Sequence, residues 1–107
     1  MRRYGQVIGF NQEFKEEYVS AHAACWPEVL EKITECGIRN YTIFNKGDFL
    51  FAYFEYHGDD FEAAMKKMGE DPITQEWWKV VGKAQVPLED RAEGEWWASM
   101  EEVFHCD

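Results

Sequence analysis

The chain has 107 residues, of which 46% are hydrophobic and 17% aromatic, and its formal net charge is -10 at pH 7. This length supports one hydrophobic core but not two, so we expect a single domain over residues 1–107. The negative charge excludes nucleic-acid backbones and anionic membranes from the expected partners, because both would be repelled.

Cysteine usage and the amino-terminal segment predict the cellular compartment. The first residues lack the apolar run of a signal peptide, and no stretch approaches membrane-spanning length. Cys25, Cys36 and Cys106 are widely spaced, without a Cys-x-x-Cys pair or a Cys/His cluster. This pattern predicts neither a disulfide framework nor a structural zinc site. We therefore expect a cytoplasmic protein with reduced thiols.

A strand and a divided helix are predicted at the start of the chain. Residues 4–10 alternate between two faces, as a strand does. Asn11 is a suitable cap for a helix that begins two residues later. Pro27 divides this helix into two segments, and Cys36-Gly37 ends the second one.

The rest of the chain predicts a hairpin, two more helices, a loop and a final strand. In chain order these are strands over 39–45 and 49–56 with a turn at 46–48, a helix over 61–68, a short helix from 72, a loop over 87–94 and a strand over 102–105. Asp59 or Asp60 is a suitable cap for the first of these helices, and Asp71-Pro72 opens the second.

This order, strand–helix–strand–strand–helix–strand, indicates a ferredoxin-like α+β fold with an antiparallel sheet and helices on one face. The strands are rich in Phe and Tyr, so the other face of the sheet would be strongly apolar. Such a face is normally covered by a partner, and we expect two copies to pair face to face as a homodimer.

Tyr18 and His22 are the first candidate functional residues. They lie four residues apart, so a helix places both on one face, together with the apolar side chains around them. Imidazole has an unperturbed pKa of about 6.5, which suits proton transfer near neutrality. A lone inward histidine is more often a core residue bonded to a backbone carbonyl, but the adjacent phenol favours a site. No second histidine follows at helical spacing, so a metal site is not expected, although one axial ligand would suffice for haem.

Aromatic residues provide candidate walls for this site. Tyr41 shares a strand face with Ile43 and would join the site if the helix packs on that face. Trp77 and Trp78 are adjacent in a helix and point about 100° apart, so one can enter the core while the other edges a cleft. An indole can stack on the C–H face of a sugar and donate one hydrogen bond.

Two further pairs are weaker candidates. In a strand, Trp96 and Trp97 would face opposite sides of the sheet, which argues against both being functional. Glu101 and Glu102 could supply a carboxylate, but exposed glutamates are usually solvated surface. No nucleophile elbow, phosphate-binding loop or dinucleotide fingerprint is present. The chemistry left is proton transfer in an aromatic pocket.

Four short runs, taken in order, add a resemblance. They are Glu16-Glu17-Tyr18-x-x-x-His22-x-x-x-Trp26-Pro27-Glu28, Asn40-Tyr41, Trp77-Trp78-Lys79 and Glu101-Glu102-Val103-Phe104. Over nearly the whole chain they resemble the L-rhamnose mutarotases. The resemblance implies a dimeric α+β barrel that interconverts the α and β anomers of L-rhamnose without a cofactor or metal. By position, it implies His22 as the proton donor and Tyr18, Tyr41, Trp77 and Trp78 as substrate-binding residues.

Physical reasoning supports the same mechanism. Anomers interconvert when the ring oxygen gains a proton and the anomeric hydroxyl loses one, so no electrons move. L-fucose, another 6-deoxyhexose, is an alternative substrate, because the segment around 87–97 departs from the family pattern. A haem-dependent or cofactor-free monooxygenase of the same fold and a non-catalytic sugar-binding module remain alternative functions.

Overall fold

The strands form an antiparallel sheet in the order β2-β3-β1-β4, in a computed structural model that describes residues 1–107. The strands are β1 (Arg2–Phe10), β2 (Ile38–Lys46), β3 (Phe49–Tyr56), β4 (Gln85–Val86) and β5 (Ala98–Met100). β4 and β5 are two short pieces that pair with different parts of β1. The predicted ferredoxin-like α+β architecture is confirmed, with a last strand that is divided.

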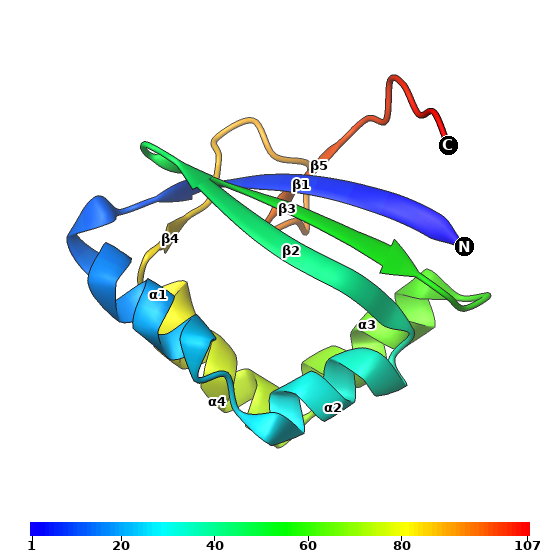
Figure 1. Cartoon of the computed structure of the whole chain (residues 1–107), viewed down its shortest axis with the longest axis horizontal. Coiled ribbons are helices and arrows are strands. Elements are labelled where there is room, and N and C mark those ends of the chain that lie inside the picture. Colours follow the sequence, from blue (N-terminus) through cyan, green and yellow to red (C-terminus); the bar gives the residue numbers. More distant parts are fainter.

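Four helices cover one face of the sheet (Figure 1). They are α1 (Lys15–Ala23), α2 (Pro27–Glu35), α3 (Phe61–Glu70) and α4 (Pro72–Gly82), and a 3-10 turn, Gln12–Phe14, precedes α1. The predicted break at Pro27 is confirmed, since this residue begins α2. None of these helices is long and apolar enough to cross a bilayer.

Polar side chains cap the 3-10 turn and two of the four helices. The Asn11 side chain accepts a hydrogen bond from the Glu13 N–H at the start of the 3-10 turn. Asp60 caps α3 and Asp71 caps α4 in the same way, each through a backbone N–H three residues later. A cap of this type contributes about 1 kcal/mol to stability. Gly37 follows α2 with a φ of 86°, a conformation that glycine adopts without strain.

The core lies between the helices and the inner face of the sheet. Ile8 of β1, Leu50 of β3 and Val29 of α2 are its most completely buried large side chains. Burying one such side chain contributes roughly 1.5–3 kcal/mol. Tyr18 and Trp77 belong to the same cluster, so the core is continuous with the predicted functional residues.

A bulge in β2 sets the direction of Tyr41. Asn40 and Tyr41 together oppose the single residue Phe54 of β3. Asn40 has a φ of 52° and its side chain donates to the Glu55 carboxylate. The Tyr41 ring meets the buried Phe54 ring edge-on, with centroids 5.6 Å apart. Tyr41 therefore lies on the inner face with Ile43, as predicted, because bulges re-aim side chains in this manner.

The predicted strand over 102–105 is wrong. β5 ends at Met100, and residues 101–107 form no regular structure. Continuing the antiparallel register of β5 would place residues 102–104 opposite residues 3–1, but the pairing with β1 ends at Met100. Only the ion pair between Arg3 and Glu102 follows that register. Glu102 is thus a surface residue, as expected if it is a solvated glutamate rather than a carboxylate of the functional site.

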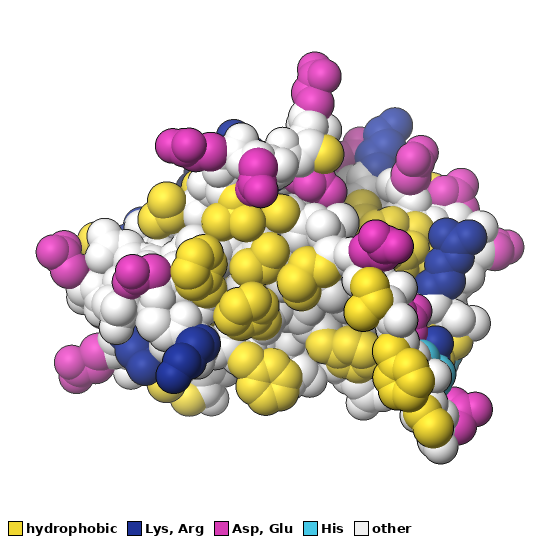
Figure 2. All heavy atoms as spheres, turned by 90° about the horizontal axis from the view of Figure 1, so that it is seen from above, with side chains coloured by type: hydrophobic (Ala, Val, Ile, Leu, Met, Phe, Trp, Pro, Cys, Tyr) yellow, Lys and Arg dark blue, Asp and Glu magenta, His cyan; other side chains and the backbone are white.

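The face of the sheet that the helices leave uncovered is apolar, and we call it the outer sheet face. Figure 2 views the molecule from this side and shows hydrophobic side chains in the middle and acidic ones around the rim. Its exposed members include Phe44, Phe49, Val86 and Met100. The segment after β5 leaves the sheet on this side (Figure 1), and its Phe104 is 81% exposed.

Candidate functional site

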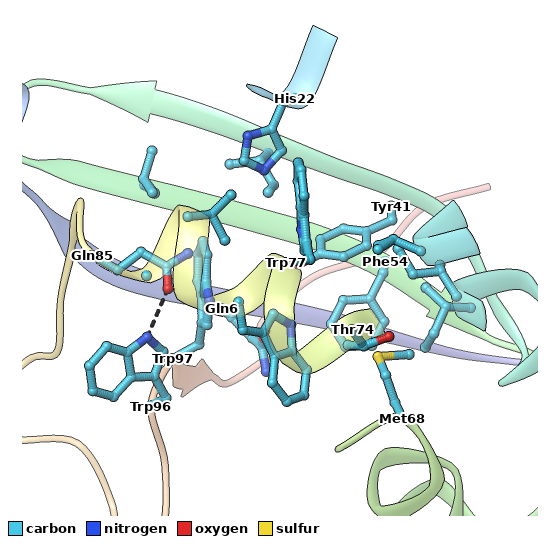
Figure 3. Close-up of a pocket in the computed structure, with 18 of the residues that line it drawn as sticks. Gln6, His22, Tyr41, Phe54, Met68, Thr74, Trp77, Gln85, Trp96 and Trp97 are labelled. Atoms are coloured by element: carbon cyan, nitrogen blue, oxygen red, sulfur yellow. Dashed lines mark hydrogen bonds between the residues drawn. The ribbon is translucent and has the colours of Figure 1, made fainter. Parts of the chain in front are cut away.

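A cavity of about 1200 Å³ lies between the helices and the inner face of the sheet. All five predicted residues line it: Tyr18, His22, Tyr41, Trp77 and Trp78. Figure 3 shows His22 of α1 and Tyr41 on two sides of the labelled Trp77. The volume slightly exceeds the usual range of about 300–1,000 Å³ for ligand pockets.

His22 is held in one tautomer by its own helix. Its Nδ1 lies 2.8 Å from the carbonyl oxygen of Tyr18. A carbonyl oxygen can only accept, so Nδ1 must carry the hydrogen of this bond. In the neutral ring, Nε2 therefore has the lone pair. This is the bond to a backbone carbonyl that the core-residue alternative describes, but it leaves the second nitrogen without a partner in the protein.

Tyr18 provides a buried hydroxyl beside this imidazole. The two ring centroids are 4.3 Å apart, and Tyr18 is only 7% exposed. Gln85 Nε2 donates to the Tyr18 hydroxyl over 3.2 Å. Burial raises the pKa of Tyr18 above its usual value, and the Gln85 bond offsets part of that rise. Tyr18 is therefore protonated near neutral pH.

Tyr41 is a second neutral phenol. Tyr41 is 43% exposed and borders the cavity. Desolvation raises the pKa of Tyr41, and the nearby Tyr18 phenol raises it further. Two tyrosines from different elements thus offer hydroxyl groups, and neither can serve as a base near neutrality.

Of the two tryptophans of α4, one enters the core and the other borders the cavity, as predicted. Trp77 is 6% exposed and packs edge-on against His22 and Trp26, with centroid distances of 5.2 and 5.4 Å. Trp78 is 47% exposed and lies at the border of the cavity. One indole therefore supports the imidazole from inside the core, and the other offers an accessible apolar surface.

Trp96 and Trp97 do not have the strand conformation on which the argument against them rested. They lie in a bend before β5 rather than in a strand, and both line the cavity. Trp96 donates from its indole Nε1 to Gln85 Oε1 over 2.8 Å, as drawn in Figure 3. No sequence pattern marks Gln85, a polar residue in a two-residue strand. Gln6 of β1 also lines the cavity and was not predicted.

The charged residues that line the cavity are Lys15, Arg39 and Glu95. Glu95 is the only carboxylate that lines it, and hydrogen bonds from Ser99 and the Ala92 N–H lower its pKa. No group of three or more His, Cys, Asp or Glu side chains is arranged to hold a metal ion. The cavity is thus an aromatic chamber with one imidazole and two neutral phenols.

Comparisons with known proteins assign the family. The model of the L-rhamnose mutarotase family matches residues 3–106. The chain belongs to this family. An L-rhamnose mutarotase of Lactiplantibacillus plantarum is 36% identical over 110 residues, with both chains covered completely. Another, from Listeria monocytogenes, is 38% identical over 81 residues, which cover 74% of this chain and 75% of the relative.

Two solved structures share the fold of this L-rhamnose mutarotase family member. A crystal structure of L-rhamnose mutarotase from Formosa agariphila has a TM-score of 0.78 with 22% identity, and both chains are covered completely. Tetracenomycin F2 cyclase from Streptomyces glaucescens, a type-II polyketide cyclase, has a TM-score of 0.75 with 21% identity, covering 100% of this chain and 98% of its own. The fold therefore accommodates different chemistries, and the reaction must be argued from the family and the site.

Proposed function

We propose that the chain is an isomerase that interconverts the α and β anomers of L-rhamnose in this cavity. The observation that carries the proposal is an imidazole of fixed tautomer, with Nε2 free, in the aromatic cavity of a chain that belongs to the L-rhamnose mutarotase family. An uncharged sugar suits a cavity with few charged groups in a chain of net charge -10.

The reaction needs two proton transfers and no electrons. Protonated His22 gives its Nε2 proton to the ring oxygen as the bond between that oxygen and the anomeric carbon breaks. The anomeric hydroxyl loses its proton, and its oxygen becomes the aldehyde carbonyl. The C1–C2 bond then rotates, and the reverse steps close the ring on either face, which restores both protons. Because only protons are exchanged, neither a metal nor a redox cofactor is required.

Water is the acceptor of the anomeric proton in this proposal. Tyr18 and Tyr41 are protonated near neutrality, because burial raises the pKa of each phenol. Glu95 is ionised, and hydrogen bonds from Ser99 and the Ala92 N–H lower its pKa, which makes it a weaker base than an ordinary glutamate. The phenols therefore act as hydrogen-bond donors to sugar oxygens, and Trp77 and Trp78 offer apolar surfaces to the C–H groups of the ring.

Anomer exchange measured by saturation-transfer NMR tests the proposed function. The purified protein is expected to accelerate the exchange of L-rhamnose anomers selectively, in a panel that includes L-fucose and an unrelated pyranose. If the protein accelerates only the exchange of L-fucose anomers, L-fucose replaces L-rhamnose as the substrate. Binding without faster exchange would favour a sugar-binding module. A Soret band or oxygen consumption would favour a monooxygenase and contradict the proposal.

We also propose that residues 1–107 act as one domain in a cytoplasmic homodimer that pairs through the outer sheet face. Cys25, Cys36 and Cys106 are all unpaired, which suits a reducing compartment. The outer sheet face is apolar at its centre and acidic at its rim, and the exposed Phe104 segment extends on the same side. A second copy can bury both features at once, because a two-fold interface pairs the same surface on each subunit.

Phe44→Glu is expected to convert this homodimer to monomers. Phe44 is 63% exposed on the outer sheet face, so the change leaves the isolated subunit intact. In a two-fold interface the buried charge occurs twice, and each copy should cost about 2 kcal/mol of association free energy. Sedimentation velocity measures the change. Ile73→Glu, an exposed position on α4, is the matched control and should remain dimeric. A dimeric Phe44→Glu protein would contradict the proposed interface.

A further inference from the structure

Tyr18, Gln85 and Trp96 form a hydrogen-bonded chain at one side of the cavity. Trp96 Nε1 lies 2.8 Å from Gln85 Oε1, and Gln85 Nε2 lies 3.2 Å from the Tyr18 hydroxyl. An indole N–H can only donate, so the Gln85 amide must turn its oxygen toward Trp96. Its NH₂ group then faces Tyr18, whose hydroxyl oxygen accepts.

This direction determines what Tyr18 can do. Its hydroxyl oxygen accepts from Gln85, and the hydroxyl makes no other hydrogen bond in the protein. The hydroxyl proton is therefore available to an acceptor in the cavity. If the amide were reversed, the Tyr18 hydroxyl would donate to the Gln85 oxygen and its proton would be used inside the protein.

We propose that Gln85 and Trp96 are positioning residues that make the Tyr18 hydroxyl a hydrogen-bond donor to an oxygen of the bound sugar. The inference rests on the proposed function, because it assigns a task within the same cavity. Neither residue transfers a proton. Trp96 orients the amide, the amide orients the hydroxyl, and the hydroxyl orients the sugar relative to His22.

The fold brings these residues together from distant parts of the chain. Gln85 pairs with Phe10 of β1, and the segment that carries Trp96 leads into β5, which pairs with β1 further along. Glu95 stabilises this segment, because its two oxygens accept from the N–H groups of Ala92 and Ser99. The indole is thus fixed at the border of the cavity although it is 51% exposed.

Gln85→Glu tests the direction of the hydrogen bonds between Trp96, Gln85 and Tyr18. The change keeps the shape of the side chain but replaces the NH₂ donor by an oxygen acceptor. As a carboxylate, the new side chain accepts from both Trp96 and Tyr18, so the Tyr18 proton is withdrawn from the sugar. At about pH 8 we expect kcat/KM to fall about 10- to 100-fold, the range for hydrogen bonds to charged groups. Protonated, the carboxyl donates to Tyr18 as the amide does. The deficit relative to wild type should therefore shrink toward pH 5.

Other titrating groups must be separated from this effect. The titratable and charged groups that line the cavity with Gln85 are Lys15, Tyr18, His22, Cys25, Arg39, Tyr41 and Glu95. Taking the ratio of wild-type to variant rates at each pH removes the dependence that both proteins share. Gln75→Glu, on the exposed surface of α4, is the matched control and should follow the wild-type pH profile. A pH-independent deficit in Gln85→Glu would overturn the inference.

A double-mutant cycle provides a second test that does not need the charged variant to fold. Trp96→Phe keeps the ring but removes the N–H, and we expect it to lower kcat/KM about 3- to 10-fold. In a Gln85→Met background the same change should have no further effect, because the amide it orients is gone. Independent, additive losses would show that the two residues do not act through one another, and would overturn the inference.

One measurement is independent of turnover. The indole N–H resonance of Trp96 should lie downfield in the wild type, move upfield in Gln85→Met and titrate with pH in Gln85→Glu. If the chemical shift of the Trp96 indole N–H is the same in the wild type and in both Gln85 variants, the inference is overturned even in an active enzyme. If this resonance behaves as expected but wild-type protein does not accelerate anomer exchange, the proposed function fails while the assigned direction of the hydrogen bonds stands.

Discussion

Replacing His22 with asparagine is expected to slow the exchange of L-rhamnose anomers by about 10²- to 10⁴-fold, the usual contribution of a positioned acid–base group. The asparagine amide can still donate to the Tyr18 carbonyl oxygen that now accepts from Nδ1. It has no group that gains and loses a proton near neutrality, so the step at the ring oxygen loses its catalyst.

The fold should survive this change, because His22 is only half-buried and the local hydrogen bond is kept. Circular dichroism and urea unfolding check the fold, and saturation-transfer NMR measures the rate. His57→Asn is the matched control, since His57 lies just after β3 and does not line the cavity. A His22→Asn protein with wild-type exchange would remove His22 from the mechanism and leave the cavity without an acid.

The elements that sequence predicted best are those set by local interactions. Asn11 and Asp71 cap the elements they precede, and Pro27 begins a helix, because each effect acts within a few residues. The hairpin was likewise confirmed, with its second strand, Phe49–Tyr56, at the predicted bounds. Tyr18 and His22 faced the core for the same reason, since helical spacing alone places them together.

The pairing of strands that are distant in the sequence could not be predicted from sequence patterns. Residues 102–105 were predicted to form a strand, but a strand also needs a partner, and the pairing of this segment with β1 ends at Met100. The bulge at Asn40 is another example. No local pattern marks it, yet it brings Ile38 and Ile43 to the same inner face although they lie five residues apart.

The wall of the cavity that includes Gln85 and Trp96 was missed for a related reason. Both residues lie in or next to very short strands, where periodicity carries almost no signal. Their importance comes from a hydrogen bond between side chains eleven positions apart, which only the pairing of β4 and β5 with β1 makes possible. Functional residues on such segments are found from structure.

The Trp77-Trp78 pair should separate stability from sugar binding. Trp77 is buried against His22 and Trp26, so Trp77→Ala leaves a large void in the core. We expect it to lower the free energy of unfolding by about 3–5 kcal/mol, as measured by urea denaturation. It should also reduce the anomer exchange rate, because the imidazole loses the ring against which it packs.

Trp78→Ala is the natural counterpart, since the same change is made one residue along the same helix. Trp78 is about half exposed and borders the cavity, so its removal creates no internal void. The free energy of unfolding should change by less than about 1 kcal/mol. The KM for L-rhamnose should rise about 3- to 10-fold, because an aromatic surface for the sugar is lost. Equal losses of stability in the two variants would contradict this division, because only the buried ring fills the core.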